Sequence, residues 1–345
     1  MMSKARFVLS KSKVSEKYDE LTRLSDIISY SFKTNAEVGK ILDNYTECFF
    51  SVHTIEDLKK LTNMKRIWFF AQAWDYNEIN ILFTKGIDKF VVDNENDLNA
   101  LLDYISIKNR TIDLLLRIRL KEHSVQTGKH FVFGISSDRI NEILPKLKQN
   151  KHIANLGIHF HRKTQNVSEW SLKEELQDTI KNWDSISLVN IGGGIPAEYK
   201  NFSATVLQDI FAKIIDLRKW LNSKKIKMII EPGRYIAAYA VKLEASIKSI
   251  YDNNIIIDCS VYNAAMDTFV AHIRLLVENE LEEDTNQGEP YTIKGGTPDS
   301  MDIFRYRVFL KNPKVGEKIV FLNAGAYTYS TDFCNLSKLK TVVVD

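Results

Sequence analysis

The segment Lys-Met-Ile-Ile-Glu-Pro-Gly-Arg-Tyr at residues 227–235 divides the chain into two parts of different character. Before it, short runs of β-branched or aromatic residues alternate with longer amphipathic stretches. After it, helical periodicity fades and β-rich segments separated by turns take over. Alternating strands and helices predict a parallel sheet with crossover helices, whereas a succession of short strands predicts an antiparallel sheet.

The first part of the chain contains eight strand-like runs. We expect strands at residues 27–31, 48–52, 67–70, 89–92, 113–119, 156–160, 187–191 and 227–230. Helical patterns lie between several of these runs, at residues 54–61, 76–84, 95–104 and 136–149. Eight strands, each followed by a crossover, predict an α/β fold built on a (β/α)8 TIM barrel, which we place at residues 24–236.

The rest of the chain predicts a second domain. We expect strands at residues 240–251, 254–258, 291–294, 306–310, 318–323 and 341–344, with a polar loop at 278–289. The N-terminal run at residues 5–9 completes the set. We therefore expect a mostly antiparallel β-sheet domain formed by residues 1–23 and 237–345.

The composition excludes several classes of protein. The 345 residues include 47 basic and 44 acidic side chains, with a formal net charge of +3, and the lysines are scattered. We therefore expect no nucleic-acid partner. No apolar run is long enough for a membrane span or a secretory signal, so we expect no membrane partner. The three cysteines form no Cys-x-x-Cys pair, which favours a reducing, cytoplasmic location.

Lys33 follows the first barrel strand directly, in Ser-Tyr-Ser-Phe-Lys-Thr-Asn at residues 29–35. A lysine in such a turn is most often a solvated surface residue. Active sites of TIM barrels gather at the carboxyl ends of strands, and burial there can lower the pKa of a lysine toward use as a nucleophile. Lys33 is therefore a candidate Schiff-base lysine.

Two histidines lie in the segment Gly-Ile-His-Phe-His-Arg-Lys-Thr-Gln at residues 157–165, and Thr164 follows them in the loop. His159 fits the pattern of a buried core histidine. His161 is the better site candidate, because a flat imidazole can stack on a flat cofactor ring. A metal site is not indicated, since no Asp, Glu or Cys lies at a useful spacing.

Three consecutive glycines, Gly192, Gly193 and Gly194, follow the seventh strand. Glycines let backbone N–H groups approach an anion closely, although a flexible loop would have the same composition. The pattern is not Gly-x-Gly-x-x-Gly, and no Walker lysine follows it. Neither a dinucleotide nor a nucleoside triphosphate is therefore indicated.

Glu231 ends the last barrel strand, and Arg234 comes three residues later. A carboxylate at this point could pair with a protonated ring nitrogen, and the planar fork of Arg234 could bind a phosphate. An ordinary surface ion pair is the alternative for each residue taken alone. Together with Lys33, a stacking histidine and a glycine triplet, they describe a flat ring with an aldehyde, a ring nitrogen and a phosphate. That ligand is pyridoxal phosphate.

These motifs resemble those of the fold-type III pyridoxal-phosphate decarboxylases, which include the ornithine, diaminopimelate, arginine and carboxynorspermidine decarboxylases. The resemblance covers nearly the whole chain and implies an alanine racemase-like barrel with a C-terminal β domain. It implies that Lys33 carries the cofactor and that His161 stacks on its ring. The other cofactor-binding residues implied are Arg117, Thr164, Gly192, Gly193, Gly194, Glu231 and Arg234.

The resemblance extends into the second domain. Gly-Ala-Tyr-Thr at residues 325–328 is similar to a family motif whose tyrosine, here Tyr327, touches the phosphate. Gly-Gly-Thr-Pro-Asp at residues 295–299 resembles the loop that one subunit of a homodimer inserts into its partner's active site. This likeness implies that Asp299 contacts the substrate there and is a catalytic residue. Phe333 aligns with an aromatic residue that lines the substrate pocket in some members.

Three features depart from the family pattern. The inserted loop has Pro298 where the family has a cysteine that protonates the α-carbon, so Tyr327, a water or the Lys33 ammonium would have to supply the proton. Asp57 is only a loose match to the family's acidic residue after the second strand. The segment 258–274 does not match the ornithine or diaminopimelate enzymes and is closer to carboxynorspermidine decarboxylase.

The resemblance implies decarboxylation of an α-amino acid of diamino-acid or carboxy-polyamine type, or of a larger molecule that bears an amino-acid head. An amino-acid racemase on the same barrel is one alternative. Racemases need two bases, whereas the acidic Glu231 favours the electron-sink chemistry of decarboxylation. A non-catalytic pyridoxal-phosphate-binding protein is the other alternative, and the second domain with its own motifs argues against it.

Overall fold

The computed structural model describes residues 4–120, 133–283 and 287–345, and the chain divides into two compact units. The barrel unit consists of Asp19–Ile195 and Val206–Gly233. The β unit consists of Met1–Tyr18, Pro196–Thr205 and Arg234–Asp345. The β unit is therefore assembled from segments that are far apart in the sequence, whereas the barrel unit is interrupted only by residues 196–205.

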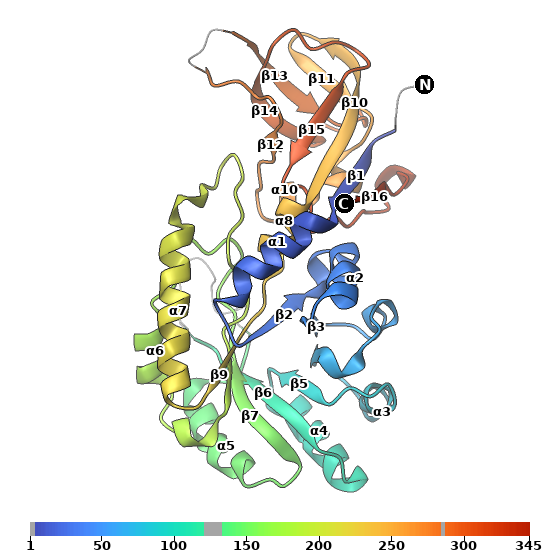
Figure 1. Cartoon of the computed structure of the whole chain (residues 1–345). Helices are drawn as coiled ribbons and strands as arrows, with labels where there is room; N and C mark the ends of the chain where they lie inside the picture. The colour runs from blue at the N-terminus through green and yellow to red at the C-terminus, as the bar shows by residue number, and fades with distance from the viewer. Residues whose placement is uncertain (1–3, 121–132, 284–286) are drawn as a thin grey trace. The chain divides into compact units, whose positions relative to one another are not determined.

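The barrel unit is a closed barrel of eight parallel strands (Figure 1). The strands are β2 (Ile27–Ser31), β3 (Phe49–Val52), β4 (Ile67–Phe70), β5 (Lys89–Val92), β6 (Ile112–Arg117), β7 (Ile153–His159), β8 (Leu188–Asn190) and β9 (Lys227–Ile230). Each strand pairs with the next along the chain, and β2 closes the barrel by pairing with β9. The expected TIM barrel is confirmed.

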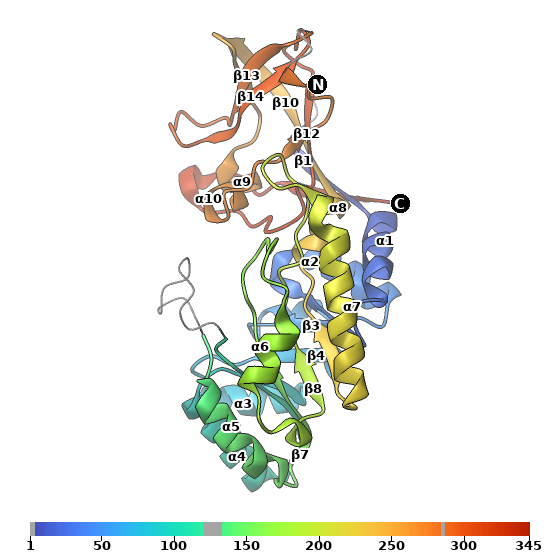
Figure 2. The same ribbon diagram turned by 90° about the vertical axis from the view of Figure 1, so that its left-hand side faces the viewer.

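Burial on both faces explains why the barrel strands are nearly continuous apolar runs. One core cluster takes side chains from five different strands: Trp68, Phe70, Val91, Leu115, Leu188 and Ile229. The helices outside the strands are α2 (Ala36–Tyr45), α3 (Tyr76–Thr84), α4 (Glu95–Lys108), α5 (Ser137–Lys148), α6 (Leu172–Thr179) and α7 (Leu207–Ser223). Helix α7 packs on β9 and lies beside α6 (Figure 2).

The helix expected at residues 54–61 is wrong in type. The structure has a short 3-10 helix, η2 (Asp57–Lys60), followed by a second one, η3 (Met64–Arg66). Ile55, Leu58 and Leu61 recur at every third position, and Leu58 and Leu61 are buried. This spacing fits the three residues per turn of a 3-10 helix better than the 3.6 residues of an α-helix.

The β unit contains the second sheet, in the order β12-β15-β10-β11-β13-β14, with β1 pairing with β10 and β16. Its strands are β1 (Arg6–Ser10), β10 (Val241–Tyr251), β11 (Asn254–Ile257), β12 (Leu276–Val277), β13 (Glu289–Lys294), β14 (Ile303–Leu310), β15 (Lys318–Leu322) and β16 (Lys340–Val344). Two pairings, β1 with β16 and β11 with β13, are parallel, and the other pairings are antiparallel. The expectation of a separate, mostly antiparallel sheet is confirmed.

Four helices lie next to these strands in the sequence: α1 (Lys11–Thr22), α8 (Arg234–Ala240), α9 (Val261–Ala264) and α10 (Asp267–Val270). The sequence patterns did not predict them. The first contains few apolar residues, and the last two are single turns, which leave no periodicity to detect.

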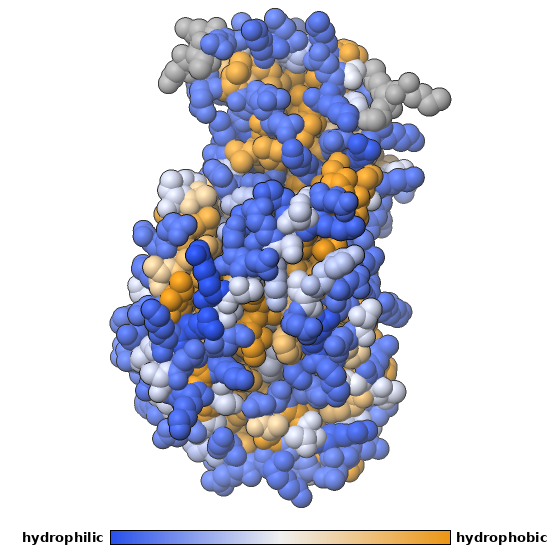
Figure 3. Space-filling model, viewed as in Figure 1, coloured by the Kyte–Doolittle hydropathy of each residue, from blue (hydrophilic) through white to orange (hydrophobic). Residues whose placement is uncertain are grey.

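Hydrophilic residues cover most of the face shown in Figure 3, and apolar residues reach it in scattered groups. Single exposed apolar side chains are ordinary for a globular protein. Within the described ranges, no helix combines the length and the apolar character needed to cross a membrane.

Candidate active site

Five predicted site residues lie at the carboxyl end of the barrel. Lys33 follows β2, and Arg117 is the last residue of β6. His161, Gly192 and Glu231 follow β7, β8 and β9 within two residues. Because all eight strands are parallel, their carboxyl ends share one rim, which is where active sites of TIM barrels form.

Lys33 lies in a short 3-10 turn, η1 (Phe32–Thr34), between β2 and α2. Asn35 ends this turn and caps α2, because its side chain accepts hydrogen bonds from the N–H groups of Glu37 and Val38 at 3.0 and 3.3 Å. The buried Tyr30 hydroxyl donates to the Asn35 carbonyl at 3.0 Å. The turn that presents Lys33 is therefore fixed on both sides.

Lys33 and His161 are both exposed to solvent, yet they are surrounded by enough protein for desolvation to lower their pKa values. This combination is expected of side chains that project into a concave site. For Lys33, desolvation lowers the pKa of the amine most, Arg117 acts in the same direction, and Glu231 opposes them. A lowered pKa increases the neutral, nucleophilic fraction of the amine.

Glu231 is buried and receives three side-chain hydrogen bonds. Ser51 Oγ and Asn190 Nδ2 donate to its Oε1 at 2.7 and 2.9 Å. His159 Nε2 lies 3.2 Å from the other oxygen, Oε2. The carboxylate at the end of β9 is therefore held by residues of β3, β7 and β8.

Two further contacts extend this network. Ser51 uses its only proton for Glu231, so the 2.8 Å contact between the hydroxyls of Ser29 and Ser51 must be a bond donated by Ser29. Asn190 Oδ1 accepts the N–H of Gly192 at 2.9 Å while its Nδ2 donates to Glu231. One amide therefore connects the glycine triplet with the carboxylate.

Glu231 and His159 form a coupled buried pair. Desolvation alone would raise the pKa of the Glu231 carboxyl, but His159 and the hydrogen bonds from Ser51 and Asn190 lower it to about 2. Desolvation also lowers the pKa of His159. At neutral pH the Glu231 carboxyl is therefore ionised, and His159, Ser51 and Asn190 all stabilise its charge.

His161 lies against the glycine triplet. Its Nδ1 accepts the N–H of Gly193 at 3.3 Å, so the neutral ring carries its proton on Nε2. Desolvation, followed by the positive charge of Arg117, lowers the pKa of His161 to about 4. The imidazole is therefore neutral and flat at physiological pH, as a ring that stacks on a cofactor should be.

The glycine triplet requires glycine at each position. Gly192 and Gly194 have φ values of +70° and +98°, which side-chain-bearing residues rarely adopt. Gly193 has an ordinary φ, but a Cβ on it would lie 2.5 Å from the Glu231 carbonyl oxygen. The Gly194 carbonyl accepts the N–H of Asn166 at 2.8 Å, which ties the triplet to the loop that contains Thr164.

Arg117 is partly buried, and desolvation lowers the pKa of its guanidinium, with Glu231 and Asp93 opposing this. Its guanidinium carbon lies 5.6 Å from the centre of the Phe133 ring. An arginine keeps its charge even when its pKa is lowered. Arg117 therefore adds a permanent positive charge close to the end of β6.

His53, which follows β3, was not predicted from the sequence. Its ring stacks on Phe70 with centroids 4.7 Å apart, and Phe70 meets His159 edge-on at 5.1 Å. Desolvation, followed by the charge of Lys33, lowers the pKa of His53 to about 4. It also lines a cavity of about 260 Å³ in the barrel unit.

Asp57, the loose match to the family's acidic residue, instead pairs with Lys60 at 2.8 Å.

Arg234 and Tyr327 come together within the β unit. The guanidinium carbon of Arg234 lies 5.1 Å from the centre of the Tyr327 ring. The buried guanidinium donates to Asp267 and, at 3.0 Å, to the Tyr199 hydroxyl. Gly325 allows this approach, because a Cβ on it would lie 1.9 Å from a backbone oxygen of α8, the helix that Arg234 begins.

Asp299 and Phe333, the two predicted substrate residues, meet at Tyr262 in the β unit. The Tyr262 hydroxyl donates to Asp299 Oδ1 at 3.2 Å, and the same oxygen accepts the Met301 N–H at 2.7 Å. The Phe333 ring stacks on Tyr262 with centroids 4.1 Å apart. Tyr262 was not predicted from the sequence, because no motif within the segment 258–274 distinguishes it.

The barrel residues fit pyridoxal phosphate. Lys33 supplies an amine of lowered pKa, His161 a neutral flat ring and Glu231 an ionised carboxylate. Two buried polar atoms, Thr34 Oγ1 and His159 Nδ1, have no hydrogen-bond partner in the part of the chain that the structure describes. That part also contains no cluster of three or more His, Cys, Asp or Glu side chains that could hold a metal ion.

Comparison with known proteins also indicates a pyridoxal-phosphate site. Residues 55–238 match the family model described as pyridoxal-dependent decarboxylase, pyridoxal binding domain. The chain belongs to the pyridoxal-dependent decarboxylases. The family drawn from the sequence motifs and its cofactor, pyridoxal phosphate, are both confirmed.

Individual relatives have low sequence identity to this chain, but the similarity extends over most of its length. The probable ornithine decarboxylase of Dictyostelium discoideum is 24% identical over 88% of this chain and 70% of its own length. The 2-[(L-alanin-3-ylcarbamoyl)methyl]-2-hydroxybutanedioate decarboxylase of Staphylococcus aureus is 23% identical over 87% of this chain and 82% of its own. The solved lysine decarboxylase of Selenomonas ruminantium shares the fold, with a TM-score of 0.82 and 19% identity, over 98% of this chain and 92% of that chain.

Like His53 and Tyr262, the residues that hold Glu231 were not predicted from the sequence. Ser29 and Ser51 are short polar residues within apolar strands, and Asn190 is a single polar residue that ends β8 just before the glycine triplet. His159 was interpreted as a core residue, and it is indeed buried, but it also binds Glu231. All four residues are polar side chains within apolar barrel strands, and this pattern alone could have indicated a buried hydrogen-bond network.

Proposed function

We propose that this chain carries pyridoxal phosphate on Lys33 and removes CO2 from an α-amino acid to give an amine. The observation that carries the proposal is Glu231, a buried and ionised carboxylate with three side-chain partners at the end of β9. Such a group favours a protonated ring nitrogen on a bound pyridine. Family membership supports the same activity.

The bound cofactor supplies an electron sink for the charge that CO2 loss leaves on the α-carbon. In this proposal Glu231 holds the ring nitrogen protonated and so strengthens that sink. His161 would stack on the ring, and Arg117, Thr164 and the glycine triplet would complete the binding site. Desolvation lowers the pKa of Lys33, so its ammonium gives up a proton more readily than that of a solvated lysine.

The racemase alternative is less well supported. A racemase must return a proton to the α-carbon of its substrate. A ring that withdraws little charge from the α-carbon favours this reprotonation. An ionised Glu231 anchored by Ser51, Asn190 and His159 has the opposite effect. The lowered pKa of Lys33 would serve a non-catalytic cofactor carrier equally well, and a test for CO2 release distinguishes the carrier from an enzyme.

The roles of the β unit are also part of the proposal. Arg234 and Tyr327 would contact the cofactor phosphate, and Asp299 and Phe333 would line the substrate site. We propose a homodimer with shared sites, in which Asp299 serves the partner's Lys33. The cysteines Cys48, Cys259 and Cys334 are all free, which supports a cytoplasmic location.

We propose that the enzyme recognises the amino-acid head of its substrate, whereas the tail is of diamino-acid, carboxy-polyamine or larger type. Two relatives named above differ widely in the tail of the molecule that they are named for, ornithine in one and a hydroxybutanedioate in the other. Both molecules have an α-amino acid in common, and this common part is what the proposal assigns to the barrel site.

CO2 release across a panel of substrates tests the proposal. The panel contains ornithine, lysine, arginine, diaminopimelate, carboxynorspermidine and the alanyl-hydroxybutanedioate compound. We expect cofactor-dependent release from at least one compound, and none from the Lys33→Ala variant. Racemised but undecarboxylated substrate would identify a racemase instead, and an inert yellow protein would identify a carrier.

A further inference from the structure

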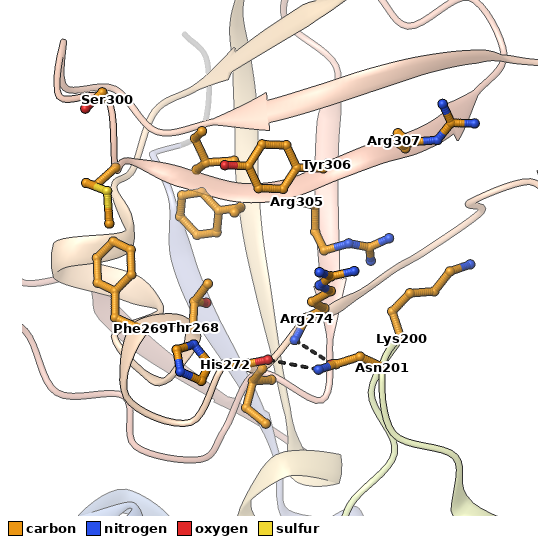
Figure 4. A pocket seen from close by; sticks show the side chains of 14 residues that line it. Lys200, Asn201, Thr268, Phe269, His272, Arg274, Ser300, Arg305, Tyr306 and Arg307 are labelled. Atoms are coloured by element: carbon orange, nitrogen blue, oxygen red, sulfur yellow. Dashed lines mark hydrogen bonds between the residues drawn. The ribbon is translucent and has the colours of Figure 1, made fainter.

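The β unit contains a cavity of about 570 Å³ that none of the proposed active-site residues lines (Figure 4). This volume is in the range of small-molecule sites. Three separate segments form its walls: the stretch around Lys200, the stretch from α10 to Arg274, and β14 with the residues before it. A cavity assembled from distant segments of one unit is a place where a ligand could be enclosed.

The charges on the cavity wall are all of one sign. Lys200, Arg274, Arg305 and Arg307 line it, and no Asp or Glu among the described residues does. His272 also lines the wall. Figure 4 shows Arg274 and Arg305 extending toward the same part of the cavity from different segments. Convergent cations with no lining carboxylate attract anions.

Nearby carboxylates neutralise only part of this charge. Glu280 lies 3.2 Å from Lys200 and 2.8 Å from Arg305, so one carboxylate serves two cations. Glu283 pairs with Arg307. The guanidinium of Arg274 is exposed and has no hydrogen-bond or ion-pair partner in the described ranges. Among the described residues, the four lining cations and these two carboxylates leave a net charge of +2 for a ligand.

Backbone geometry directs these side chains at the cavity. Asn201 accepts the Arg274 N–H and donates to the His272 carbonyl, both at 2.9 Å, and the Lys200 N–H donates to the Arg274 carbonyl at 2.9 Å. Lys200 and Arg274 are thereby fixed next to each other. His272 itself has a φ of +52°, an unfavourable value for a residue with a side chain.

A bulge in β14 also directs side chains toward the cavity. Between the pairs Ile293–Arg305 and Tyr291–Val308, β14 contains one more residue than β13 does. Arg307 at this bulge has a φ of +50°, and Arg305, Tyr306 and Arg307 all line the cavity although strand neighbours normally face opposite ways. Bulges often re-aim side chains next to functional sites.

The remaining wall is suited to a carbon skeleton. Phe269, Ile273, Met301 and Phe304 provide apolar surface, and Thr268 and Ser300 add hydroxyl groups. A bare inorganic ion would use the cations but leave this apolar wall without a partner. We propose that the cavity binds a small organic polycarboxylate, with Arg274 as the main contact for one carboxylate and Lys200 with Arg305 and Arg307 for the others.

Calorimetric titration tests this proposal on the full-length protein saturated with pyridoxal phosphate, which keeps the cofactor's own anion site filled. The probes are citrate, inorganic phosphate and spermidine. We expect saturable citrate binding that weakens as salt is added. The Arg274→Gln variant should bind citrate about tenfold more weakly or worse. Arg274→Lys should keep part of the affinity, and Lys314→Gln, the loss of an exposed lysine elsewhere in the β unit, should change nothing.

Several results would overturn the proposal. Citrate that fails to bind at millimolar concentration, or binds Arg274→Gln as well as the wild type, would remove the site. Phosphate that binds as tightly as citrate would show that the apolar wall is not used and that the ligand is any small anion. A change of oligomeric mass in Arg274→Gln without citrate binding would assign these cations to a subunit interface.

Discussion

The hydrogen bonds that keep Glu231 ionised can be tested by removing them. Ser51 and Asn190 donate to the same oxygen of Glu231, at 2.7 and 2.9 Å. We expect the double variant Ser51→Ala, Asn190→Ala to raise the pKa of Glu231, because a buried carboxylate that loses its donors is a weaker acid. Above the raised pKa the site should work as before, and below it Glu231 can no longer pair with a protonated ring nitrogen.

The size of the effect follows from the number of bonds lost. A hydrogen bond to a charged group is worth about 1.5–3 kcal/mol, and one pKa unit corresponds to about 1.4 kcal/mol. Each substitution should therefore raise the pKa of Glu231 by about 1–2 units, and the pair by about 2–4 units. Starting from a pKa of about 2, the Glu231 carboxyl of the double variant should have a pKa of about 4–6.

The assay is the affinity of the apoprotein for pyridoxal phosphate, followed by absorbance from about pH 4 to about pH 8. The ratio of variant to wild-type affinity cancels the ionisations that belong to the cofactor. Since the wild-type carboxyl stays ionised throughout this range, the ratio should be flat above the raised pKa. Below the raised pKa the ratio should fall, by at most about tenfold for each pH unit, and then level off at the weaker affinity of a site with a neutral side chain at position 231.

Ser29→Ala is the matched control. Ser29 donates to Ser51, one bond further from the carboxylate, and its removal leaves the Ser51–Glu231 bond in place. We expect this variant to shift the pH dependence far less than the double variant does. A ratio that stays flat for the double variant, or an equal shift for Ser29→Ala, would refute the role given to these donors.

Three further predictions concern the proposed reaction. Glu231→Gln should retain the cofactor but release CO2 about a hundredfold more slowly or worse, and near wild-type turnover would exclude the ring as the electron sink. Pro298→Cys should change the fraction of abortive transamination, measured from the products, whereas unchanged products and rate would place position 298 away from the α-carbon. Lys33→Ala and Asp299→Ala, each inactive alone, should regain roughly a quarter of wild-type activity after subunit exchange, because half of the dimers are mixed and each has one intact site. Background activity despite confirmed exchange would assign Asp299 to its own chain's site.

The barrel could be predicted from the sequence because its strands are buried on both faces. The runs at residues 27–31, 67–70, 89–92 and 227–230 have the same bounds as β2, β4, β5 and β9. The α-helix predicted at residues 54–61 was wrong because the apolar residues there recur at every third position. An α-helix, with 3.6 residues per turn, only approximates this spacing. Short single-turn helices such as α9 and α10 leave no periodic signal at all.

The polar network around Glu231 could not be predicted, for a different reason. Ser51 and Glu231 are 180 positions apart, and they meet only because β2 closes the barrel by lying between β3 and β9. In the sequence Ser51 is one polar residue in an apolar strand, with nothing to distinguish it from a tolerated hydroxyl. Sequence motifs indicate the residues that contact a ligand. The residues that hold those ligand-binding side chains in place are known only once the neighbouring strands are known.

Asn190 shows why this second group of residues matters to the chemistry. Its amide donates to Glu231 and accepts from Gly192, so the carboxylate and the start of the glycine triplet cannot move independently. The His161 ring is tied to the same triplet through the Gly193 N–H. If the triplet holds a phosphate, the group that orients the far end of the cofactor also sets the position of the carboxylate at its ring nitrogen. Catalytic groups need to be held within a fraction of an ångström, and a single rigid amide between two strand ends can do this where separate loops could not.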